Sequence, residues 1–108
     1  MSVDEDRILG MSKALSYHVF ELETKIENYQ AYVVFRSSIK SVLSKLGQEL
    51  SKEILDTKEL NQCAYAIFRL VTESSVLEAS SFGKELLTLD DEIRTLTRLI
   101  DGNNEIAP

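Results

Sequence analysis

The sequence predicts an all-α fold, an antiparallel helical hairpin or bundle of three to four helices. Apolar residues recur at helical spacing along most of the chain. Only four glycines and one proline interrupt its 108 residues. No Asn-Gly or Asp-Gly pair joins two alternating apolar runs, as in β-hairpins. The length predicts one domain at residues 6–101, with short tails at 1–5 and 102–108.

The first predicted helix is one long element. Two interleaved sets of apolar residues recur every seven positions: Ile8, Leu15, Leu22 and Tyr29, and Val19, Ile26 and Val33. This spacing is typical of the a/d seam of a coiled coil. The pattern changes phase around residues 33–35 and resumes through Leu46, which indicates a new packing partner or a stutter. We expect one helix from Asp6 to Leu46, about 63 Å long at 1.5 Å per residue.

Two further helices follow. Asp56 has the position of an N-cap, Glu59 lies three residues later, and Leu55 and Leu60 can form a hydrophobic staple. The last helix has apolar residues at alternating steps of four and three, from Phe82 through Leu86, Leu89, Ile93 and Leu96 to Ile100. These two helices would be about 36 and about 30 Å long.

Helix length predicts self-association. Two shorter helices folded beside a 63 Å helix cover about half of it, and the remaining apolar seam then needs another chain. The alternative is a turn near Ser37-Ser38, which would give a compact four-helix bundle in one chain. We expect the long helix and a homodimer or larger assembly.

The candidate interface follows from this expectation. It combines the seam of the first helix with the most apolar stretch of the chain, which is apolar nearly all round a helix and is therefore expected to be buried. Its residues are Leu15, Val19, Leu22, Ile26, Tyr29, Tyr32, Val33, Val34 and Phe35.

Charge is unevenly distributed. The net charge is −6, which disfavours non-specific binding to nucleic acid. Residues 36–58 alone are net positive, and Arg36, Lys40 and Lys45 form a candidate anion contact on this strip. The other interpretation is that the strip faces acidic segments of the same or a neighbouring chain, and this is the one we favour.

The sequence predicts no enzyme, cofactor or metal site. One histidine and one cysteine cannot supply a zinc or iron–sulfur site within a single chain. His18 is expected to be an ordinary helix residue, and Cys63 a small buried apolar residue.

The expected function is a non-enzymatic protein–protein interaction module, such as an adaptor, an assembly subunit or a small chaperone-like protein. One alternative is an acidic inhibitor of the immunity type, which blocks a basic enzyme. A nucleic-acid accessory factor using the strip at residues 36–52 is a weaker alternative. We expect protein partners, no membrane association, and a cytoplasmic location, with the nucleus as the alternative, because the acidic N-terminus does not resemble a targeting signal.

The apolar stretch yields a first test. Replacing Val33 and Val34 together by aspartate should unfold the protein or dissociate its assembly, because it places charge in a segment expected to be buried. Circular dichroism and light scattering on a sizing column measure the two effects. A fully folded, unchanged oligomer would show that the segment is neither core nor interface.

Overall fold

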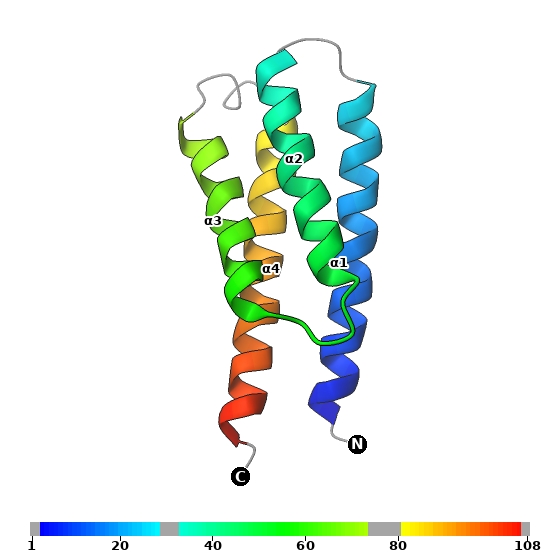
Figure 1. Ribbon diagram of the computed structural model, residues 1–108, viewed down its shortest axis with the longest axis vertical. Helices are drawn as coiled ribbons and strands as arrows, with labels where there is room; N and C mark the ends of the chain where they lie inside the picture. The colour runs from blue at the N-terminus through cyan, green and yellow to red at the C-terminus, as the bar shows by residue number, and fades with distance from the viewer. Residues whose placement is uncertain (1–2, 29–32, 74–80, 107–108) are drawn as a thin grey trace.

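The protein is all-helical over the residues that the structure, a computed structural model, describes: 3–28, 33–73 and 81–106. Side chains are described for residues 5–28, 36–73 and 82–102. The helices are α1 (Val3–Glu27), α2 (Val33–Leu50), α3 (Thr57–Glu73) and α4 (Ser81–Ile106). Successive helices run in opposite directions, so that α1 begins and α4 ends at the same end of the bundle, here named the base (Figure 1). The predicted all-α class is confirmed over these residues, and the four helices fit a helical bundle.

The prediction of a single long N-terminal helix is wrong. α1 ends at Glu27, and α2 begins at Val33 and runs back along it. The alternative, a turn near Ser37-Ser38 that gives four helices in one chain, is right about the four helices but places the turn too late, because both serines lie inside α2. The change of phase at residues 33–35 marks the start of a second helix with its own apolar face. The whole bundle measures 50 × 22 × 18 Å.

The first and last helices extend into the residues that were expected to form tails. α1 already begins at Val3, and α4 continues to Ile106, so most of the residues expected in the two tails are helical.

One apolar core joins the four helices. Each helix packs against two neighbours, in the order α1, α2, α3, α4 and back to α1. Each contributes a stripe of apolar side chains, mostly at steps of three or four residues, as expected for the inner face of a helix. The stripes are Leu15, Val19, Leu22 and Ile26; Ile39, Leu43, Leu46 and Leu50; Leu60, Cys63, Ala64 and Ile67; and Phe82, Leu86, Leu89, Ile93, Leu96 and Ile100.

The start of α3 confirms the predicted cap. Oδ1 of Asp56 accepts hydrogen bonds from the backbone N–H groups of Lys58, at 3.0 Å, and Glu59, at 3.4 Å. These donors have no partner within the helix, so the carboxylate fixes the point at which α3 begins. Leu55, just before the cap, packs against the core.

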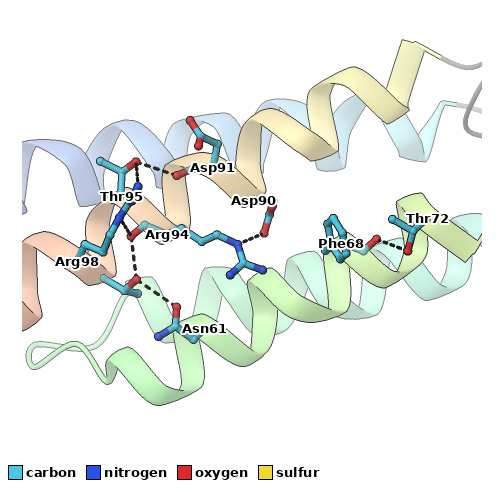
Figure 2. Close-up of polar contacts among 9 residues, drawn as sticks. Asn61, Phe68, Thr72, Asp90, Asp91, Arg94, Thr95 and Arg98 are labelled. Carbon is cyan, nitrogen blue, oxygen red and sulfur yellow. Dashed lines mark hydrogen bonds and ion pairs between the residues drawn. The ribbon is translucent and has the colours of Figure 1, made fainter.

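A buried polar contact fixes α3 against α4. Thr97 is 3% exposed, and its hydroxyl lies 3.1 Å from Oδ1 of Asn61 on α3 (Figure 2). The same hydroxyl lies 3.0 Å from the carbonyl oxygen of Arg94. Because a buried hydroxyl without a partner is costly, this contact favours one register between the two helices.

Unequal helix lengths leave the base open. α1 and α4 have 25 and 26 residues, whereas α2 and α3 have 18 and 17. At the base, α1 and α4 extend beyond the connection between α2 and α3 (Figure 1). The apolar side chains near this connection therefore have fewer neighbours than those of the central layers.

Stability should depend on the central layers. Replacing Ile93 by alanine should lower the free energy of unfolding by about 2–5 kcal/mol, because Ile93 is fully buried and the change leaves a cavity. Urea unfolding followed by circular dichroism measures the effect. Leu87→Ala on the same helix is the control, since this side chain is 45% exposed and should cost about 1 kcal/mol or less. Equal losses at both positions would contradict the assignment of the core.

Candidate functional site

Four of the candidate interface residues belong to the core of a single chain. Leu15, Val19, Leu22 and Ile26 are 1–3% exposed, because α2 and α4 cover this side of α1. A side chain covered by its own chain offers no surface to a partner. The reason for expecting an interface at these residues is therefore removed.

The side chains of the other five candidate interface residues are not described. Tyr29 and Tyr32 fall outside the described residues. Val33, Val34 and Phe35 form the first turn of α2, but their side chains also lie outside the described part of the chain.

The basic strip contacts carboxylates of the same chain. Lys40 forms an ion pair with Glu27 across the α1–α2 contact, and Lys45 lies 3.0 Å from Glu49 and 3.6 Å from Glu59. The neighbouring Lys40 ammonium lowers the pKa of Glu27, and Glu49 raises the pKa of Lys45. Arg36 has an interaction as well. Lys40 and Lys45 therefore fit the interpretation in which the strip faces acidic groups of the same chain.

The single histidine bridges two helices. Nδ1 of His18 on α1 lies 2.8 Å from Oε2 of Glu92 on α4, and both border a shallow groove of about 460 Å³ between these helices. Farther along the groove, Lys25 forms an ion pair with Glu85. The sequence did not suggest that His18 contacts Glu92, since the two residues are 74 positions apart. The two pairs link α1 to α4.

The single cysteine lacks the setting of a reactive thiol. Cys63 is 4% exposed, and burial raises the pKa of its thiol. A nucleophilic cysteine needs a lowered pKa and access to solvent. The structure thus agrees with the expected role of Cys63 as a small core residue.

The described residues contain neither a metal cluster nor a membrane span. No group of three or more histidine, cysteine, aspartate or glutamate side chains there could hold a metal ion. No helix in the described ranges is long and apolar enough to cross a membrane.

A recess with both apolar and polar lining lies at the base of the bundle. This basal groove has a volume of about 730 Å³ and runs between the first half of α1 and the α2–α3 connection. Its lining consists of Glu5, Ile8, Leu9, Ser12, Lys13 and Ser16 on α1, residues 50–55, and Ile100 on α4. The α1 residues recur at steps of three, four and one, so they form one face of that helix.

Two apolar side chains at this groove are exposed to solvent. Ile54 in the α2–α3 connection is 84% exposed, the highest value among the exposed large apolar side chains, and Leu9 on α1 is 55% exposed. Covering an isoleucine of this kind stabilises by about 1.5–3 kcal/mol. The groove therefore offers apolar surface that favours association.

A buried carboxylate anchors the connection that forms one wall of the groove. Glu49, at the end of α2, is 1% exposed, and its Oε2 accepts contacts of 3.0 Å from both Lys45 and Lys52. These ammonium groups outweigh the effect of burial and lower the pKa of Glu49, with Lys52 the larger influence. Because Lys52 also lines the groove, this ion pair ties the groove wall to α2.

The sequence contained a signal for the groove that the helical pattern obscured. Between the predicted helices, Ser51, Lys52 and Glu53 form a polar connection, and Ile54 is a large apolar residue within it. Connections are normally exposed, so an isoleucine there indicates either a core contact or a binding surface. Only the structure distinguishes these outcomes, because Leu55 packs against the core whereas Ile54 remains outside it.

Glu49 generates a pH-dependent prediction. Its pKa is lower in the folded chain than the ordinary value, so its ion pairs stabilise the fold above that value and this contribution is lost as the pH falls through the folded pKa. The difference in free energy of unfolding between the wild type and Glu49→Gln should therefore be largest near neutral pH and shrink in acid. Urea unfolding at a series of pH values measures it, with the exposed Glu53→Gln as control. A difference that stays constant would contradict this role.

Comparison with known proteins gives no relative from which a function can be transferred. No family model, curated protein or solved structure matches this chain. The function of the chain is therefore inferred from its own surfaces.

Proposed function

We propose that this protein is a non-enzymatic protein–protein interaction module, an adaptor, assembly subunit or small chaperone-like helical protein, that acts in the cytoplasm. The observation that carries this proposal is the basal groove with Ile54 beside it, 84% exposed. The proposal no longer depends on the seam of α1, which the chain covers itself. Its binding surface is instead the groove.

The groove has the composition of a binding site for a protein segment. Ile8, Leu9 and Ile54 supply apolar surface, and charged side chains on α1 and in the connection surround it. An apolar centre with a polar rim is the usual anatomy of a protein interface. Its α1 wall spans residues 5–16, about 16 Å along the helix axis, which suits two to three turns of a partner helix.

The ion pairs favour this function over an acidic inhibitor. Glu85, Glu92 and Asp90 on α4 contact Lys25, His18 and Arg94, respectively, within the same chain. Carboxylates that are engaged in this way contribute less to the attraction of a basic enzyme. The same reasoning applies to the nucleic-acid alternative, because Lys40 and Lys45 contact glutamates of their own chain.

Site-specific cross-linking tests the proposed function. A photo-reactive amino acid at position 54, introduced into the chain in its native cells, should capture a protein, because the native side chain there is directed to solvent beside the groove. Gel electrophoresis then shows a product heavier than the 12.2 kDa chain. The control is position 87 on α4, also apolar and 45% exposed but outside the groove. Capture at position 54 no stronger than at position 87 would overturn the proposal.

A further inference from the structure

The basal groove carries both halves of an apolar contact on one patch. Ile54 lies on the wall of the groove and extends into solvent, and Ile8, Leu55 and Ile100 border the same recess. In a twofold dimer each subunit presents the same patch to the other, so an apolar projection and an apolar recess must occur together on it. The groove meets this requirement, since Ile54 of each copy can enter the recess of the other.

Charge at the rim points to the same partner. Four charged residues line the groove, Glu5 and Lys13 on α1 and Lys52 and Glu53 in the connection, and their formal charges cancel. The whole chain has a net charge of −6, which attracts basic partners in general. Lys52 is engaged with Glu49, but across a twofold axis the exposed Lys13 and Glu53 of one copy can face Glu53 and Lys13 of the other.

Exposed apolar surface continues beyond the groove along α1. Phe20 is 66% exposed, and it lies eleven positions after Leu9, three helical turns along the same stripe of the helix. Because the groove already reaches Ser16, Phe20 extends the contact by four residues, about 6 Å along the helix axis. This extension contributes toward the roughly 800 Å² per subunit that a stable interface buries.

We infer that the occupant of the basal groove is a second copy of this chain, which docks by a twofold axis with Ile54 of each subunit in the groove of the other. This inference rests on the proposed function of the groove as a protein-binding surface and names its partner. It differs from the dimer expected from the sequence, because the seam of α1 takes no part in it.

Removal of the apolar projection is the first test. Ile54→Asp should weaken the dimer about a hundredfold or more, because a twofold interface contains the altered side chain twice. Sedimentation equilibrium from low to high micromolar concentration measures the effect, and circular dichroism verifies the fold, which an 84% exposed position should not disturb. Leu87→Asp is the matched control and should leave the dimer intact. A wild-type chain that stays monomeric throughout, or an Ile54→Asp chain that dimerises like the wild type, would overturn the inference.

Charge exchange at the rim is the second test. Glu53→Lys leaves a basic rim and Lys13→Glu an acidic one, so each variant alone should dissociate, whereas an equimolar mixture should form a heterodimer. Both side chains are exposed, which limits effects on folding. A mixture as monomeric as its components would contradict the twofold contact. If these tests fail while position 54 still cross-links a different protein in cells, the proposed function stands and this inference alone fails.

Discussion

The rest of the structure depends on the burial of the α1 apolar stripe by helices of the same chain. Leu15, Val19, Leu22 and Ile26 occupy one side of α1, and the return of α2 and α4 along this helix removes them from water. Each such side chain contributes about 1.5–3 kcal/mol on burial, so the stripe as a whole requires a cover. Once α2 provides part of it, the order of neighbours around the bundle follows, and the core closes within one chain.

Hydrogen bonds and ion pairs between side chains link neighbouring helices. Glu27 and Lys40 link α1 to α2, Thr97 and Asn61 link α4 to α3, and His18 and Glu92 link α1 to α4. Most of these groups are partly exposed, where an ion pair contributes little to stability. Their effect is instead to engage charge within the chain.

Particular residues show how far the sequence could predict this arrangement. The cap at Asp56 and the stripe from Phe82 to Ile100 followed from local spacing, because they depend on contacts within one helix or at its start. The break between α1 and α2 did not, since no glycine or proline marks it and a phase change at residues 33–35 fits either a stutter or a new helix. The groove was also missed, because it combines α1 with a connection some 40 residues later in the chain.

The sequence by itself determined that the chain is helical and which side of each helix is apolar, since both follow from the periodicity of side chains along a local backbone. Tertiary structure alone decided what covers each stripe. Ile54 and Leu55 are adjacent and equally apolar in sequence, yet Leu55 packs against the core while Ile54 faces solvent. The physical reason is that burial is a property of the surrounding helices, whose unequal lengths leave the base of this bundle open.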